Sequence, residues 1–75
     1  MSNKEELKRL AENGNVEAQF SLGEYYDEVE KNISEACKWY EKAARQDHAE
    51  SQFCLGYYYR FGDKGFPADI EKSRY

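Results

Sequence analysis

Apolar residues recur along most of this chain at the spacing of an α-helix. Between Ile33 and Gln46 they form one stripe, and the charged residues lie outside it. This stripe consists of Ile33, Ala36, Cys37, Tyr40, Ala43 and Ala44. The segment from Asn15 to Tyr26 begins two such stripes. The first consists of Val16, Phe20, Gly23 and Asp27, of which only Asp27 is not apolar. The second consists of Ala18, Leu22, Tyr25 and Val29. A helix with two apolar faces is typical of the inner layer of a solenoid, where neighbours cover it on two sides.

The chain also repeats itself with a period of 33 residues. Residues 11–26 and 44–59 share eight identical residues in 16 aligned positions. The identical pairs are Ala11/Ala44, Glu17/Glu50, Gln19/Gln52, Phe20/Phe53, Leu22/Leu55, Gly23/Gly56, Tyr25/Tyr58 and Tyr26/Tyr59. A period of this length indicates stacked supersecondary units. We therefore predict that residues 48–60 form a second copy of the helix at 15–26.

Together these patterns predict an all-α fold, a short α-solenoid of antiparallel helix pairs with five helical segments. Residues 1–75 form a single domain, in which residues 3–13 are an N-terminal capping helix. Residues 15–46 form the first repeat. Residues 48–75 form the second repeat, with a truncated last helix at 69–75.

That last helix is under two turns long, and a helix so short is not stable on its own. Solenoids normally end in a capping unit with a polar outer face, and none follows Tyr75. We therefore expect one face of the helix at 48–60 to be poorly covered. A chain that is naturally this short would hide that face in a homo-oligomer or against a partner; the alternative is that the chain is a fragment.

Helix-start signals agree with these limits. Asn32 precedes Glu35, and Asp47 precedes Glu50, by the three residues that separate the ends of a capping box. His48 stands at the start of the second repeat, which favours a capping or solvent-exposed role over a metal-binding one.

Two glycines lie in the middle of predicted helices, Gly23 and Gly56, where glycine costs about 1 kcal/mol relative to alanine. Their recurrence at the same position of both repeats indicates close approach by a neighbouring helix. We expect Phe20 and Phe53 to pack as wedges beside these gaps.

Several motifs resemble the Sel-one-like repeat, a relative of the tetratricopeptide repeat. In the first copy they are Glu17-Ala18-Gln19, Leu22-Gly23-Glu24-Tyr25-Tyr26 and Lys38-Trp39-Tyr40-Glu41-Lys42-Ala43-Ala44. In the second they are Glu50-Ser51-Gln52 and Leu55-Gly56-Tyr57-Tyr58-Tyr59. The resemblance covers about residues 7–75. It implies a non-catalytic scaffold or adaptor that binds other proteins on a concave helical surface.

Composition narrows the function. The 75 residues carry 11 basic and 15 acidic side chains, a net charge of -4, which argues against nucleic acid as a direct ligand. No apolar run approaches a membrane span and no secretory signal follows Met1, so we expect a cytoplasmic protein without a membrane partner. The acidic excess is concentrated in Glu24, Asp27, Glu28 and Glu30. It is either a solvated loop or a contact for a basic partner surface.

Positions where the repeats differ are the candidates for binding. Tyr57 stands where the first repeat has Glu24, and Phe61 stands where it has Glu28. Aromatic residues are enriched at interface hot spots. The alternative is that Tyr57 and Phe61 cover the longer loop of the second repeat. The candidate partner-binding residues are Tyr57, Phe61, Phe66, Tyr75, Glu24, Asp27 and Glu28.

No enzyme, cofactor or metal site is predicted. Cys37 and Cys54 do not form a C-x-x-C pair, and with His48 they match no zinc spacing. We interpret both thiols as small buried side chains in a reducing compartment, with a disulfide between neighbouring helices as the alternative.

Three hypotheses of function remain. They are a small adaptor or inhibitor of a partner protein, a self-associating structural module, and an acidic mimic that occupies a basic site on a nucleic-acid-binding partner.

Overall fold

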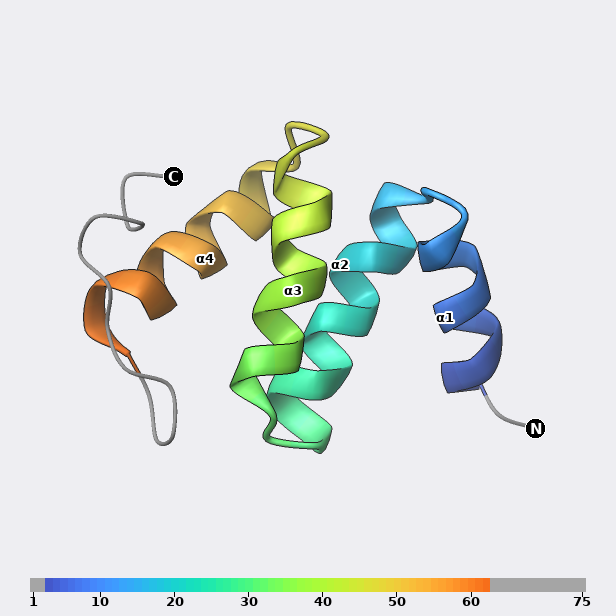
Figure 1. Ribbon diagram of the computed structural model, residues 1–75, viewed down its shortest axis with the longest axis horizontal. Coiled ribbons are helices and arrows are strands. Elements are labelled where there is room, and N and C mark those ends of the chain that lie inside the picture. Colours follow the sequence, from blue (N-terminus) through green and yellow to red (C-terminus); the bar gives the residue numbers. More distant parts are fainter. Residues whose placement is uncertain (1–2, 63–75) are drawn as a thin grey trace.

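The computed structural model describes residues 3–62, which form four α-helices and one short π-helix (Figure 1). These are α1 (Asn3–Glu12), α2 (Val16–Glu24), η1 (Tyr25–Val29), α3 (Ile33–Ala44) and α4 (Ala49–Phe61). No strand occurs between residues 3 and 62. The predicted all-α class is confirmed. The predicted last helix at 69–75 lies outside the described residues.

The helices zigzag in chain order, so that each packs against the next (Figure 1). α2 lies between α1 and α3, and α3 lies between α2 and α4. Two buried clusters hold these layers together. The first consists of Ala11, Ala18, Leu22 and Trp39, with Leu7 and Tyr26 packed against it. The second consists of Ile33, Ala36, Cys37, Tyr40, Ala44, Leu55 and Tyr59, with Phe20, Tyr26, Cys54 and Tyr58 packed against it. The antiparallel helix pairs predicted from the repeat are therefore present.

The repeat is visible in individual hydrogen bonds. The side-chain amide of Gln19 in α2 donates to the carbonyl of Ala11 at 3.0 Å. The amide of Gln52 in α4 donates to the carbonyl of Ala44, 33 residues further on, at 3.1 Å. Each glutamine therefore makes the same hydrogen bond, from its side-chain amide to a backbone carbonyl near the end of the preceding helix. This is a structural reason for glutamine at both positions, because a partly buried amide needs a hydrogen-bond partner.

The turns that precede α2 and α4 also correspond. Gly14 has φ 99° and Asp47, at the same position of the next turn, has φ 66°. Both follow the end of a helix, where a residue in the left-handed region commonly stops the helix. Asn15 then accepts from the amide of Ala18 at 2.9 Å, and His48 Nδ1 accepts from the amide of Ser51 at 3.2 Å.

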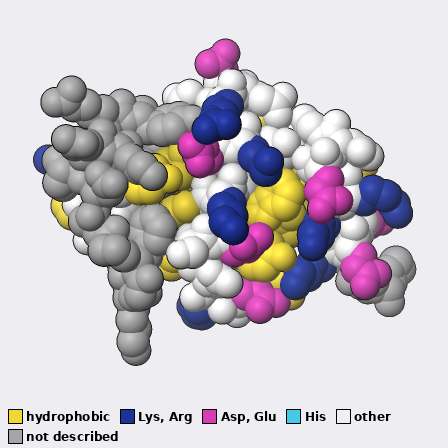
Figure 2. Space-filling model, in the orientation of Figure 1, with side chains coloured by type: hydrophobic (Ala, Val, Ile, Leu, Met, Phe, Trp, Pro, Cys, Tyr) yellow, Lys and Arg dark blue, Asp and Glu magenta, His cyan; other side chains and the backbone are white. Residues whose placement is uncertain are grey.

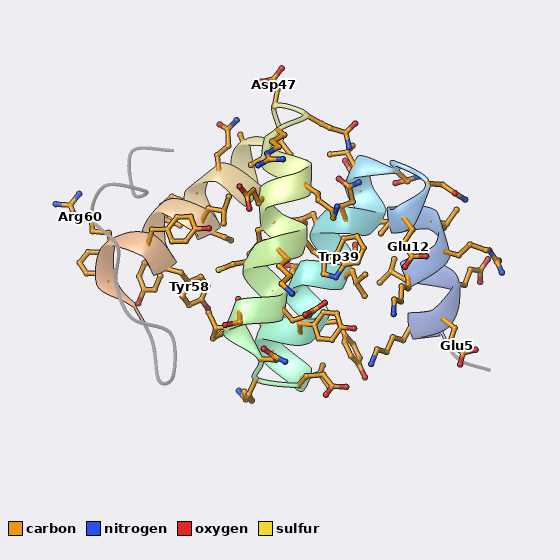
Figure 3. The ribbon with its side chains drawn as sticks, in the orientation of Figure 1. Glu5, Glu12, Trp39, Asp47, Tyr58 and Arg60 are labelled. Atoms are coloured by element: carbon orange, nitrogen blue, oxygen red, sulfur yellow. The ribbon has the colours of Figure 1, made fainter. Side chains whose placement is uncertain are left out.

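This arrangement corrects one predicted helix start. The residue that caps α4 is His48, whereas Asp47 points away into solvent from the turn (Figure 3). The positive φ of Asp47 places it in the turn itself, one residue before the cap. The predicted cap at Asn32 is confirmed, since its side-chain oxygen accepts from the amide of Glu35 at 3.1 Å.

Close approach at Gly23 is confirmed. A Cβ atom on Gly23 would lie 2.6 Å from Cδ1 and Cε1 of Tyr40, and 3.3 Å from the carbonyl oxygen of Ala36. The ring of Phe20 packs beside this gap, 5.7 Å from the Tyr40 ring and 4.7 Å from the His48 ring. Its counterpart Phe53 is different. It is 75% exposed, so the prediction of a packed wedge at Phe53 is wrong for the described structure.

Candidate interaction surface

Most of the segment between α2 and α3 is helical, whereas a solvated loop was one of the two interpretations of the sequence. Residues Tyr25–Val29 continue α2 as a π-helix, in which the amide of Glu30 donates to the carbonyl of Tyr25 at 3.2 Å. A π-turn adds a residue to the helix and so changes the direction in which the following side chains point. The side chain of Asp27 is thereby half-buried among its neighbours.

Asp27 is a structural centre rather than a free surface charge. Its Oδ2 accepts from the Tyr40 hydroxyl at 3.0 Å, and its Oδ1 accepts from the Tyr58 hydroxyl at 2.7 Å. One carboxylate therefore joins η1 to α3 and to α4. Burial, followed by the charge of Asp27 and the hydrogen bond to it, raises the pKa of Tyr40, which keeps this hydroxyl protonated as a donor.

Glu24 and Glu28, the other two acidic candidates, are exposed. Burial raises the pKa of Glu24, and the nearby charges of Glu28, Glu50 and Asp27 raise it further. Glu50 belongs to α4, so acidic side chains from both repeats lie close enough to repel one another. The sequence prediction omitted Glu50, because its match to Glu17 marked it as a residue of the fold. On the face shown in Figure 2, by contrast, acidic and basic side chains are intermixed over α1 and α3.

Tyr57 and Phe61, which we name the Tyr57 patch, form an exposed aromatic pair on α4. Tyr57 is 51% exposed and Phe61 is 65% exposed, and their ring centroids lie 5.2 Å apart. α4 continues as far as Phe61, so the expected i, i+4 neighbours do share one side of the helix. The guanidinium of Arg60 lies 5.6 Å from the Phe61 ring centroid. Phe66 and Tyr75, the two remaining candidates, lie outside the described residues.

Both cysteines are free thiols. Cys37 is buried in the cluster between α3 and α4, and Cys54 is half-buried beside it. Burial, together with the charge of Asp27, raises the pKa of Cys37 to about 12 and also raises the pKa of Cys54. A thiol that stays protonated is a poor nucleophile. Among residues 3–62, no three His, Cys, Asp or Glu side chains form a group that could hold a metal ion.

We expect Cys37 to resist alkylation in the folded chain. At about pH 8 iodoacetamide should modify it at least about 100-fold more slowly than in denaturant, because burial suppresses both its thiolate and its access. The raised pKa also sets a pH dependence. Below pH 9.0, the ordinary pKa of a cysteine, the protonated Cys37 thiol contributes fully to the free energy of unfolding. This contribution is lost as the pH rises towards its raised pKa of about 12. Mass spectrometry of timed alkylation checks the first point, and equal rates in both states would contradict it.

Searches against known proteins and families add one positive result. The family model for the Sel1 repeat matches residues 16–48 and 49–75, in the same frame as the starts of α2 and α4. No curated protein and no solved structure matches the chain significantly. None of the helices within residues 3–62 is both long and apolar enough to cross a membrane. Repeats of this type are non-catalytic and generally mediate protein–protein interactions. Matched over most of its length, the chain belongs to the Sel1 repeat family.

Proposed function

We propose that this chain is a non-catalytic interaction module, a small adaptor or inhibitor that binds a partner protein through the Tyr57 patch. The observation that carries the proposal is a pair of adjacent exposed rings where the first repeat has two glutamates. Positions shared by the repeats, such as Gln19 and Gln52, make the contacts of the fold. Tyr57 and Phe61 depart from the repeat, and two large rings side by side in water favour coverage by a partner.

The charges near the Tyr57 patch suggest the chemistry of the partner. Glu50 lies two turns before Tyr57 on the same side of α4, and its charge acts on Glu24 across the helices. Glu28 also acts on Glu24. A basic partner surface would relieve the repulsion among these three carboxylates while its apolar residues cover the rings. We propose that Asp27 holds this surface in place and does not contact the partner, because both of its oxygens accept hydrogen bonds within the chain. Phe66 and Tyr75 remain sequence predictions.

Replacing both rings by the residues of the first repeat tests the proposal. The variant Tyr57→Glu/Phe61→Glu should lose its partner from a pull-down in extract of the native host, because it removes the apolar contact and adds two charges. The loss should exceed about tenfold in recovered partner, equivalent to about 1.4 kcal/mol. Quantitative mass spectrometry of the captured proteins measures it.

The control is Leu10→Glu, which places one such negative charge on an exposed apolar residue of α1 (41% exposed). It should retain the partner. A photo-crosslinking residue at position 57 should also trap the partner, whereas one at Glu12 should not. If the folded double variant captures the same proteins in the same amounts as the wild type, the Tyr57 patch is not the binding site.

A further inference from the structure

The ammonium group of Lys4, in the first turn of α1, lies in a cage of side chains from the segment that follows α2. Its Nζ is 5.1 Å from the ring centroid of Tyr25 and 5.1 Å from that of Tyr26. It also donates to Oε2 of Glu30 at 3.4 Å, and the Tyr25 hydroxyl donates to the same oxygen at 3.2 Å. We name Tyr25, Tyr26 and Glu30 the Lys4 cage. Aromatic faces and a carboxylate are the groups that attract an alkylammonium ion.

The second repeat makes the corresponding contact without a charge. With the period of 33 residues Lys4 corresponds to Cys37 of α3, and the two cage tyrosines correspond to Tyr58 and Tyr59. Cys37 is 3% exposed and belongs to the same buried cluster as Tyr59, with Tyr58 packed against that cluster. An apolar thiol therefore meets the tyrosine pair in the second repeat, whereas a cation meets it in the first.

The later turns of α1 are anchored by other contacts. Ala11 belongs to the buried cluster between α1, α2 and α3, and Leu7 packs against it. The carbonyl of Ala11 also accepts the hydrogen bond from Gln19. Lys4 lies about one turn before Leu7 and two turns before Ala11. Because the end of a helix can open while the rest stays docked, Lys4 and its cage close the turn that lies beyond these anchors.

This closure depends on the charge of Lys4. An ammonium group attracts both the rings and Glu30, whereas a neutral amide in its place would keep only the methylene stem against the rings. The Lys4 side chain is 35% exposed, so that a reagent can reach its nitrogen.

Acylation is the modification that removes this charge. After the ammonium has released one proton to solvent, its nitrogen attacks the carbonyl carbon of an acyl thioester. A carbon–nitrogen bond forms and the carbon–sulfur bond breaks. The thiolate leaves and takes up a second proton from the nitrogen, so that the product is an uncharged amide.

We propose that Lys4 is a modification site and a charge-dependent latch of α1. As an ammonium it holds the first turn of α1 against the Lys4 cage, and its acylation opens that turn. The latch joins α1 to the segment that follows α2, whereas the Tyr57 patch lies on α4. Partner binding and the latch are therefore separate properties, and either can fail without the other.

Hydrogen exchange of the full chain with a modified residue at position 4 tests the latch. Nε-acetyl-lysine and Nε-trimethyl-lysine are similar in size, and only the second keeps the positive charge. The amides of Leu7 and Lys8 report on the first turn, because helical hydrogen bonds join them to its carbonyls. With acetyl-lysine they should exchange at least about threefold faster than in the wild type, and with trimethyl-lysine within about twofold of it. The Tyr40 amide in α3 is the internal control and should not change.

The outcome that overturns the proposal is equal exchange at Leu7 and Lys8 in the acetylated and the trimethylated chain. If both are slow, the turn does not need the charge. If both are fast, the added bulk and not the lost charge opens it.

A double-mutant cycle tests the part played by Glu30. Glu30→Gln alone should make the amides of Leu7 and Lys8 exchange at least about twofold faster. In a Lys4→Gln background the same change should have clearly less effect, because the cation that Glu30 attracts is absent. Equal effects in both backgrounds would mean that Glu30 acts on α1 without Lys4, and would contradict the latch.

Discussion

Replacing Gly23 by leucine is expected to unfold most of the chain at room temperature. The first added carbon already meets the Tyr40 ring at 2.6 Å and the Ala36 carbonyl oxygen at 3.3 Å, so either the ring or the α2–α3 spacing must shift. Even Gly23→Ala should lower the free energy of unfolding, by up to about 2 kcal/mol. The cost of overpacking, about 1–3 kcal/mol, outweighs the gain of about 1 kcal/mol in helix propensity. Urea unfolding followed by circular dichroism measures the difference.

Gly56→Ala is the control, because it makes the same change at the same position of the second repeat. α3 does not cover this side of α4, as the exposure of Phe53 shows. We expect this substitution to leave stability unchanged or to raise it by up to about 1 kcal/mol. Equal losses at Gly23 and Gly56 would contradict the view that contact with Tyr40 makes Gly23 necessary.

Asp27→Ala is expected to lower the free energy of unfolding by about 2–3 kcal/mol, a large fraction of the stability of so small a domain. The change removes two hydrogen bonds to one carboxylate and leaves the hydroxyls of Tyr40 and Tyr58 without that acceptor. Bonds to a charged group are stronger than neutral ones, and each joins a different helix to η1. Thermal unfolding should show a lower midpoint and earlier loss of near-ultraviolet tyrosine signal.

A double-mutant cycle separates these hydrogen bonds from the general effect of changing Asp27. Tyr58→Phe alone should cost about 1–2 kcal/mol, since it removes the 2.7 Å bond. In an Asp27→Ala background the same change should cost clearly less. If Tyr58→Phe costs the same in both backgrounds, the carboxylate does not stabilise the fold through this hydroxyl.

The fold was largely predictable because its helices have strong local signals. The stripe from Ile33 to Ala44 and the repeated Leu-Gly pairs specify both the helices and their stacking. The π-helix was not predictable in this way. Asp27 interrupts an apolar stripe, which the sequence alone suggests is the end of the buried face. Its role depends on two tyrosine hydroxyls supplied by α3 and α4, and a helical period contains no information about such distant partners.

Phe20 and Phe53 show a second limit of sequence reasoning. They are identical residues in matching positions, yet Phe20 packs against Tyr40 while Phe53 is 75% exposed. Burial depends on whether a neighbouring helix is present, and the repeat predicts only the position. The expectation that one face of the helix at 48–60 is poorly covered agrees with this exposure. Identical residues at matching positions of a repeat can therefore lie on corresponding helices and still differ in burial.

The candidate site was predicted from the positions at which the two repeats carry different residues. Tyr57 and Phe61 were identified by their mismatch to Glu24 and Glu28, and their rings are indeed exposed and adjacent. Glu50 was missed because it matches its counterpart, although its proximity to Glu24 gives it an additional electrostatic role. Only the packing of the two repeats reveals that proximity.

One exchange variant tests the central claim, that binding belongs to the residues by which the second repeat departs from the first. The variant Glu24→Tyr/Glu28→Phe/Tyr57→Glu/Phe61→Glu moves the rings to the first repeat and keeps composition and net charge unchanged. The measurement is the amount of partner that the folded variant captures from extract of the native host, relative to the wild type. The account predicts native helical circular dichroism with the partner lost. Full capture of the same partner by this variant would contradict it.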